Sequence, residues 1–168
     1  LFIFIDNLPY ELMDMIRRMT YKIQSKELLN QLKNRHILKK LIYETYSPIY
    51  SHELQNDPKA VENWIDNDIS LSLNKENASM YGYIEHYYTI LSRNRVFNTK
   101  EKIDTFSDIC FTKMDAKTTI NIYLGLLNES DITDLLSYID KTYNTNVFVK
   151  YAQKKIPTKH LENKSKIL

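Results

Sequence analysis

The chain has 168 residues, of which 43% are hydrophobic and 26% are charged, ordinary values for a globular protein in water. This length suits one domain, or one domain with a tail, that buries its own core. Only 2 glycines and 4 prolines are present, which argues against a sheet linked by tight turns and favours helices. No run of about 18 apolar residues occurs, so the sequence predicts no membrane span. The single cysteine, Cys110, excludes an internal disulfide and indicates a reducing, intracellular compartment.

The first predicted helix opens at Asn7-Leu8-Pro9. Proline is well suited to the first turn, where its missing N–H would have no partner in any case. Glu11 and Asp14 follow in the first turns, where carboxylates complement the positive end of the helix dipole. An apolar stripe then recurs at steps of three and four. Its members are Leu12, Met15, Ile16, Met19 and Ile23.

Two more helices are predicted before residue 75. Ser25 is a candidate N-cap for the second, and Ser47-Pro48 should end it, because the residue before proline avoids the helical region. Asp57 is expected to cap the third helix, with Pro58 in its first turn. The predicted inward residues are Leu28, Leu29, Leu32, Leu38, Leu41 and Ile42, then Val61, Trp64, Ile65 and Ile69, whereas Lys33, Arg35, Lys39 and Lys40 are expected to stay in water.

Four later helices are predicted from capping residues followed by apolar periodicity. The expected caps are Asn77, then Asn98 with Glu101 three residues on, then Asp115, and finally Asn128 or Ser130. The corresponding apolar residues are Met80, Ile84, Tyr87, Tyr88 and Leu91; Ile103, Phe106, Ile109, Cys110 and Met114; Ile120, Tyr123, Leu124 and Leu127; and Ile132, Leu135, Leu136, Ile139 and Tyr143.

Together these patterns predict an all-α fold, a single irregular bundle of six to seven helices over residues 1–149. Val147-Phe148-Val149 is the best strand candidate and could pair with Phe2-Ile3-Phe4 in one short terminal ladder. Residues 150–168 hold six lysines against Glu162 alone. Subtracting this local charge of +5 from the total of +2 leaves −3 for the remainder. We therefore expect an acidic helical domain followed by a basic extended tail.

The sequence contains few residues in catalytic or metal-binding patterns. With only Gly82 and Gly125, no glycine-rich phosphate loop can form, and the histidines show no metal-ligand spacing. Asp66 and Asp68 diverge on a helix, and acids at a helix start such as Asp131 and Asp134 stabilise the dipole without any catalysis. The sequence thus predicts a protein that is not an enzyme and needs no cofactor or metal.

Tyrosine is unusually frequent, with 13 residues, four of them between positions 81 and 88. Such rings could stack on nucleic-acid bases beside lysines. They are also typical of cores and protein interfaces, where they combine a large contact area with a polar tip. Only Arg93 and Arg95 lie near this cluster, so a protein partner is favoured over nucleic acid. Nucleic-acid binding would require cations from separate helices to converge on one face.

Leu8-Pro9-Tyr10-Glu11-Leu12, with Ile16 four residues later, resembles the opening of an F-box. That resemblance implies a small helical module that docks a cullin-ligase adaptor, while the rest of the chain captures a target. The basic, tryptophan-containing end of an F-box is replaced here by Leu38-Lys39-Lys40-Leu41. The match is therefore confined to the first helix.

The same start, in a background rich in Asn, Lys, Ile and Tyr, also resembles proteins of nucleocytoplasmic large DNA viruses. This resemblance implies a non-catalytic virion or minor-capsid assembly component, located in the virion or the host cytoplasm, with capsid or scaffold proteins as partners. An F-box-like ligase adaptor is the alternative, and a nucleic-acid-binding helical protein is the third. The predicted partner-binding residues are Leu8, Pro9, Leu12, Ile16, Lys150, Lys154, Lys155 and Lys159.

Overall fold

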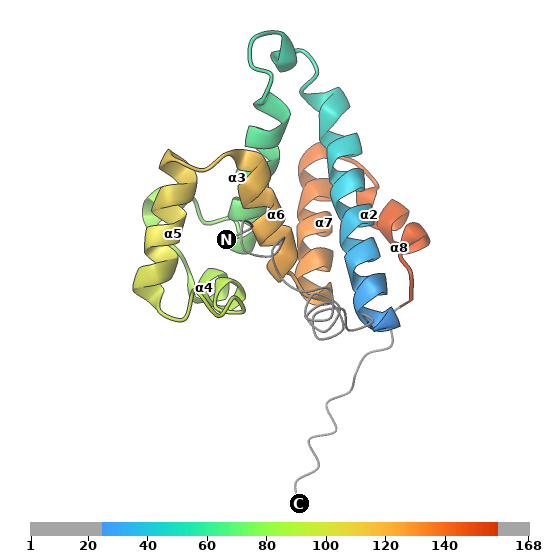
Figure 1. The fold of residues 1–168 in the computed structure, drawn as a ribbon. Coiled ribbons are helices and arrows are strands. Elements are labelled where there is room, and N and C mark those ends of the chain that lie inside the picture. The colour runs from blue at the N-terminus through green and yellow to red at the C-terminus, as the bar shows by residue number, and fades with distance from the viewer. Residues whose placement is uncertain (1–24, 158–168) are drawn as a thin grey trace, which may run out of the picture. The chain divides into compact units, whose positions relative to one another are not determined.

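The computed structural model describes the backbone of residues 25–157 and, apart from positions 110–112, their side chains. Seven α-helices and two 3₁₀ helices form within these residues, and no strand occurs among them (Figure 1). The predicted all-α fold of six to seven helices is therefore confirmed. The helices are α2 (Lys26–Ile49), η2 (Glu53–Gln55), α3 (Ala60–Leu73), η3 (Ser79–Tyr81), α4 (Glu85–Leu91), α5 (Lys100–Thr112), α6 (Ala116–Leu126), α7 (Glu129–Tyr143) and α8 (Val147–Lys154).

The chain divides into two compact units, residues 33–156 and a second unit made of residues 1–32 and 157–168. In the second unit, the described residues include the first turns of α2. The Ser25 hydroxyl accepts the backbone N–H of Leu28 at 3.1 Å, as predicted for a capping serine. Leu28, Leu29 and Leu32 are 39%, 43% and 54% exposed. Their predicted inward placement is therefore wrong.

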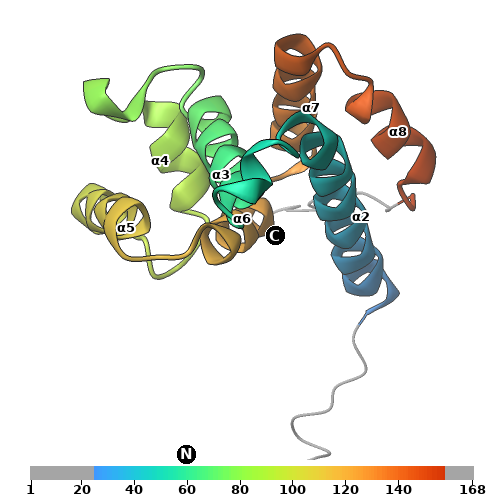
Figure 2. The same ribbon diagram turned by 90° about the horizontal axis from the view of Figure 1, so that it is seen from above.

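In the larger unit, α3 is the central helix and packs against α4, α6 and α7 (Figures 1 and 2). Its apolar stripe of Ile65, Ile69 and Leu73 is at most 2% exposed. At steps of three and four, these side chains lie on one face of the helix. A single connected core surrounds them, with further members from α2, α4, α5, α6, α7 and α8.

The last two long helices follow the prediction closely. Asp115 caps α6 by accepting the backbone N–H of Thr118. Asn128 caps α7 in a full capping box with Asp131, so the choice between Asn128 and Ser130 is settled. All four central apolar residues of α7 are buried: Ile132, Leu135, Leu136 and Ile139.

Two features of α2 differ from the prediction. The helix runs through Pro48 to Ile49 and so extends just past its predicted end. Arg35, expected in water, is half-buried and donates to the backbone carbonyls of Leu124 and Leu127, the latter at 2.9 Å. These carbonyls lie at the end of α6, where helical partners run out. The guanidinium therefore acts as a cap supplied by another helix.

Trp64 was expected in the core but is 39% exposed. Its ring stacks on Tyr50 with centroids 4.8 Å apart, and its indole N–H donates to the Glu53 carboxylate at 2.7 Å. An indole has one donor that needs a partner. A site at the edge of the core satisfies that donor while still burying one face of the ring.

Residues 147–154 form helix α8 rather than a strand and the start of an extended tail. The Asp140 carboxylate, from α7, accepts the backbone N–H groups of Val147 and Phe148 at 2.7 and 3.1 Å. Beyond α8, the buried Asn34 side chain both accepts from and donates to the backbone of Ile156, each at 2.8 Å. The folded unit thus extends past the predicted boundary at residue 149, to residue 156.

The carboxylate of Asp66, on α3, makes the stability of the protein depend on pH. One of its carboxylate oxygens is buried with no hydrogen-bond partner among the described residues, and burial raises the pKa of Asp66 from 3.8 to about 7. Between these two values the folded state holds a proton that the unfolded chain releases, so stability falls as the pH rises through this window. Allowing for partial exposure, we expect a loss of about 1–2 kcal/mol between pH 5 and pH 8.

Urea unfolding at the two pH values measures this effect. Asp66→Asn should flatten the pH dependence and make the protein more stable than wild type at pH 8. Glu44→Gln removes an acid from the exposed side of α2, where the side chain is 50% exposed, and should leave the wild-type slope in place. If the free energy of unfolding of Asp66→Asn depends on pH as steeply as that of wild type, Asp66 is not the group that causes the pH dependence.

Candidate docking surface

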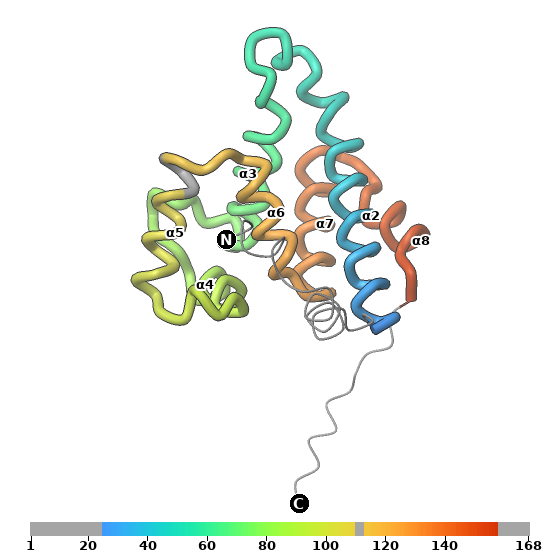
Figure 3. The backbone as a smooth tube through the Cα atoms, in the orientation of Figure 1, coloured from blue at the N-terminus to red at the C-terminus, as the bar shows by residue number. Residues whose placement is uncertain are grey.

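The connection between α3 and α4, residues 74–84, holds the two most exposed large apolar side chains among those described. Met80 is 82% exposed and Tyr81 is 79% exposed. The sequence predicted a helix here, capped by Asn77, but the chain forms turns and the short helix η3 before α4 begins at Glu85 (Figure 3). We call residues 74–84 the α3–α4 loop.

Hydrogen bonds from Asn74 fix the shape of this loop. Its side chain is 1% exposed, and its amide group donates to the carbonyls of Asn77 and Gly82 at 2.6 and 3.0 Å. Its amide oxygen accepts the backbone N–H of Ile84 at 2.8 Å. Asn77 adds a second bond to the Gly82 carbonyl, at 2.8 Å. Both ends of the loop are therefore tied to one buried side chain.

The backbone of the loop adopts conformations that most residues avoid. Lys75 and Glu76 have φ values of 50° and 62°, in the left-handed region. Gly82 has φ 86° and ψ 177°, a combination open to glycine and costly for other residues. Backbone strain of this kind persists only where the surroundings impose it, which agrees with the bonds made by Asn74.

Two ion pairs attach the start of the loop to α7. The Lys75 ammonium lies 2.6 Å from the Asp134 carboxylate, and the Lys141 ammonium lies 3.2 Å from that of Glu76. All four side chains line a hollow of about 250 Å³. Lys75 and Glu76 are the only charged residues of the loop, so its outer part, with Met80 and Tyr81, presents no unpaired charge.

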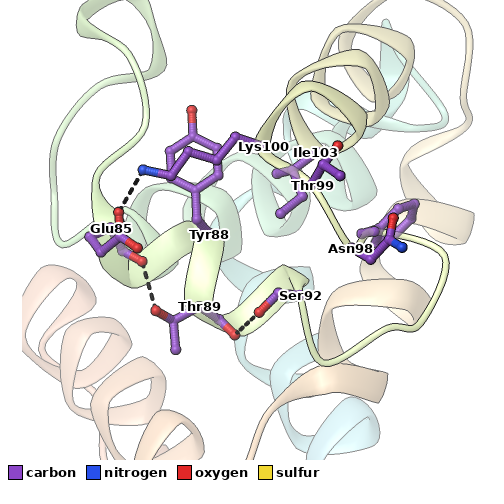
Figure 4. A pocket seen from close by; sticks show the side chains of 9 residues that line it. Glu85, Tyr88, Thr89, Ser92, Asn98, Thr99, Lys100 and Ile103 are labelled. Atoms are coloured by element: carbon purple, nitrogen blue, oxygen red, sulfur yellow. Dashed lines mark hydrogen bonds and ion pairs between the residues drawn. The ribbon is translucent and has the colours of Figure 1, made fainter.

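A second hollow, of about 200 Å³, lies between α4 and the start of α5 (Figure 4). The charged and phenolic groups that line it already have partners in the protein. The Lys100 ammonium pairs with Glu85 at 2.8 Å and sits 4.8 Å from the centroid of the Tyr88 ring. The Tyr88 hydroxyl donates to Asp104 at 2.7 Å, and this bond is the main reason why its pKa is raised to about 12. This hollow offers no free base beside a nucleophile.

A buried carboxylate, that of Asp68 in α3, contacts residues of α2 and α7. Asp68 is 4% exposed and accepts hydrogen bonds from the hydroxyls of Tyr46, at 2.7 Å, and Tyr143. A longer contact, of 3.5 Å, comes from the hydroxyl of Tyr138. Burial and the Asp68 carboxylate raise the pKa of Tyr46, so this tyrosine stays a neutral donor. The predicted divergence of Asp66 and Asp68 holds, because each has different surroundings.

The predicted lysines have different environments. Lys150 and Lys154 are exposed on α8, four residues apart and so on one face. Lys155 is half-buried and forms an ion pair with Glu129 at the start of α7. This ion pair joins α8 to α7 and leaves Lys155 less exposed than Lys150 and Lys154. The remaining predicted residues, Leu8, Pro9, Leu12, Ile16 and Lys159, lie outside the described residues.

The described part of the chain offers neither a metal site nor a membrane span. Within it, no group of three His, Cys, Asp or Glu side chains is placed to bind a metal ion. None of its helices combines the length and apolar character needed to cross a bilayer.

The sequence predicted a helix in place of the α3–α4 loop. The reason is that apolar residues recur at steps of three and four from position 80 to position 91, namely Met80, Ile84, Tyr87 and Leu91, although the first two lie in the loop. The available signal was the polar run Asn74-Lys75-Glu76-Asn77 followed by Gly82, which is typical of a turn.

Comparison of the chain with known protein-family models, with curated proteins and with solved structures found no match.

Proposed function

We propose that the chain is a non-catalytic protein-interaction domain and that the α3–α4 loop is its docking surface. The observation that supports this most directly is the exposure of Met80 and Tyr81, at 82% and 79%, on a loop whose backbone is fixed by Asn74. Methionine and tyrosine are enriched where proteins contact one another. A loop already held in shape loses little conformational entropy on binding.

The chemistry of the loop favours one kind of partner. With Lys75 and Glu76 paired to α7, the loop offers an apolar side chain and an aromatic ring without free charge. A phosphate backbone would need cations at this position. We therefore propose a protein partner with an uncharged, apolar pocket. The resemblances of residues 8–16 suggest virion assembly or ligase-adaptor binding, and these stay predictions about the identity of the partner.

The test compares co-purification of tagged full-length variants from the cells in which the chain occurs. Met80→Ser with Tyr81→Ser should reduce recovery of one specific partner at least about tenfold, as loss of interface anchors does. Val96→Ser is the matched control, since Val96 is also exposed, at 67%, but lies outside the loop. Both variants should melt like wild type. If the double variant recovers every partner at wild-type levels, the docking surface lies elsewhere.

A pair of glycine substitutions tests whether the shape of the loop matters. Gly82→Ala forces alanine to φ 86° and should weaken partner binding while leaving Met80 and Tyr81 in place, at a cost of about 1–3 kcal/mol in stability. Gly125→Ala, in helix α6 with no atom within 4 Å of the added carbon, should be neutral or stabilising by about 0.5–1 kcal/mol. If the two substitutions affect partner binding equally, the conformation of the α3–α4 loop at Gly82 does not matter for binding.

A further inference from the structure

A third hollow, of about 280 Å³, gathers cations from separate helices. We call it the lysine hollow. Its lining combines His36, Lys39, Lys40 and Tyr43 of α2 with Glu62 of α3 and Lys117 of α6. The cations come together only because α2 packs beside α6, so no linear motif marks the hollow.

The charge of this hollow is largely uncompensated. The Lys117 ammonium has no ion pair or hydrogen bond within the described residues, and the Lys39 ammonium is bonded to a neutral partner, the Asn121 amide oxygen, at 2.6 Å. Lys40 has a loose pair with Glu44, 3.7 Å away, and its side chain is 66% exposed. Against these three lysines the lining holds one carboxylate, that of Glu62. The hollow therefore carries a local positive charge.

Tyr43 adds a donor to the same hollow. Its hydroxyl is buried without a hydrogen-bond partner in the described part of the chain, although buried polar groups are nearly always satisfied. Burial, followed by the nearby charges of Glu62 and Asp115, raises the pKa of Tyr43, so the hydroxyl keeps its proton. An anionic oxygen placed in the hollow would accept a hydrogen bond from this hydroxyl and face the lysines at the same time.

From this arrangement we propose that the lysine hollow binds a small phosphate monoester. Lys39, Lys40 and Lys117 hold the phosphate, and the Tyr43 hydroxyl donates to one of its oxygens. Lysine suits this ligand because its ammonium acts as a compact point charge toward phosphate. The volume of about 280 Å³ lies at the lower end of ligand pockets, and Glu62 would repel a second phosphate. Both features favour one phosphate group over an extended nucleic-acid backbone.

Isothermal titration of the full chain tests the proposal with ribose 5-phosphate and adenosine 5′-monophosphate as probes, and with adenosine as the matched ligand that lacks phosphate. We expect both phosphates to bind with a Kd below about 1 mM, and adenosine not to bind. Binding should weaken as salt is raised, because the contacts are partly exposed. Absence of phosphate binding, or equal binding of adenosine, would overturn the proposal. Binding only to a single-stranded 20-mer oligonucleotide would also overturn it, in favour of a nucleic-acid surface.

Three substitutions locate the site. Lys117→Gln and Lys39→Gln should each weaken phosphate binding at least about fivefold, as loss of a charge-assisted contact does. Lys102→Gln removes the same charge from α5, where the ammonium bonds Asn98 at 2.9 Å, and should leave the affinity unchanged. Tyr43→Phe should weaken binding without lowering the melting temperature of the free protein, because the hydroxyl it removes has no partner there. If Lys102→Gln weakens phosphate binding as much as the other two lysine substitutions do, the effect comes from the overall charge of the protein, and the lysine hollow is not the binding site.

Discussion

Replacement of Asp68 by alanine should be among the most destabilising single changes in the chain, with an expected loss of about 3–5 kcal/mol. The Asp68 carboxylate is the acceptor for the hydroxyls of Tyr46 and Tyr143. Tyr46 is 1% exposed, so its hydroxyl cannot turn to water once the carboxylate is gone. The expected loss combines an unsatisfied buried donor with the cavity left by the missing group.

The hydrogen bonds around Asp68 extend outward in one direction. Tyr143 donates to Asp68, which leaves its oxygen to accept from the Tyr50 hydroxyl at 2.8 Å. Tyr50 in turn stacks on Trp64. This chain of contacts joins α2, α3 and α7, and satisfied polar networks of this kind specify a unique packing. Loss of Asp68 should therefore loosen three helices rather than one.

Urea unfolding of three variants measures the effect. Asp68→Asn keeps the shape and one acceptor oxygen, so we expect a smaller loss, of about 1–2 kcal/mol. Asp134→Ala is the surface control, since its pair with Lys75 leaves it 48% exposed, and exposed pairs contribute less than about 1 kcal/mol. If Asp68→Ala unfolds at the same urea concentration as Asp134→Ala, the tyrosine hydroxyls have found other acceptors and the network is not structural.

Prediction from the sequence succeeded for α6 and α7, where the cap and the apolar stripe belong to the same helix. The same approach misplaced the cap of α5, which is Thr99 rather than Asn98. Asp115 and Asn128 each cap the helix that follows within three residues, and the stripe of α7 is regular over its whole length. In such segments, local hydrogen bonding and hydrophobic periodicity point to the same structure. Neither depends on where the other helices lie.

Prediction failed where the partner group comes from elsewhere in the chain. Val147-Phe148-Val149 has strand-type residues, yet the Asp140 side chain caps these N–H groups and burial of Val147 and Tyr151 holds one face of α8. Tertiary contacts here override local propensity. Arg35 shows the same effect, because the carbonyls it binds at the end of α6 lie about 90 residues away in sequence.

For the candidate sites, the residue types could be recognised in the sequence, but which residues lie together in space could not. The tyrosines from position 81 to 88 suit both a core and a protein interface, and the helix predicted for this segment placed Met80 on the apolar face rather than in water. Lys39, Lys40 and Lys117 could not be associated before the packing of α2 beside α6 was known. Nucleic-acid binding was expected to require cations from separate helices on one face. Such a convergence occurs at the lysine hollow, and it depends on the three-dimensional packing of the helices.

Leu135→Ala should destabilise the protein by about 2–5 kcal/mol, as truncation of buried leucines does. Leu135 is 0% exposed and lies on α7 with Ile132, Leu136 and Ile139 in the main core. The substitution removes buried apolar surface and leaves a cavity that close-packed neighbours fill only in part. For a chain of this length, the loss corresponds to a fall in melting temperature of at least about 4 °C.

Leu32→Ala is the matched control for this truncation, since it makes the same chemical change on a helix at a side chain that is 54% exposed. It should shift stability by no more than about 0.5 kcal/mol. Thermal and urea unfolding of both variants, followed by circular dichroism at 222 nm, give the comparison. A melt of Leu135→Ala equal to that of Leu32→Ala would mean that the apolar face of α7 is not packed in the core. The stripe from Ile132 to Ile139 would then be a docking surface in its own right, and the α3–α4 loop would lose its claim to be the main site of partner binding.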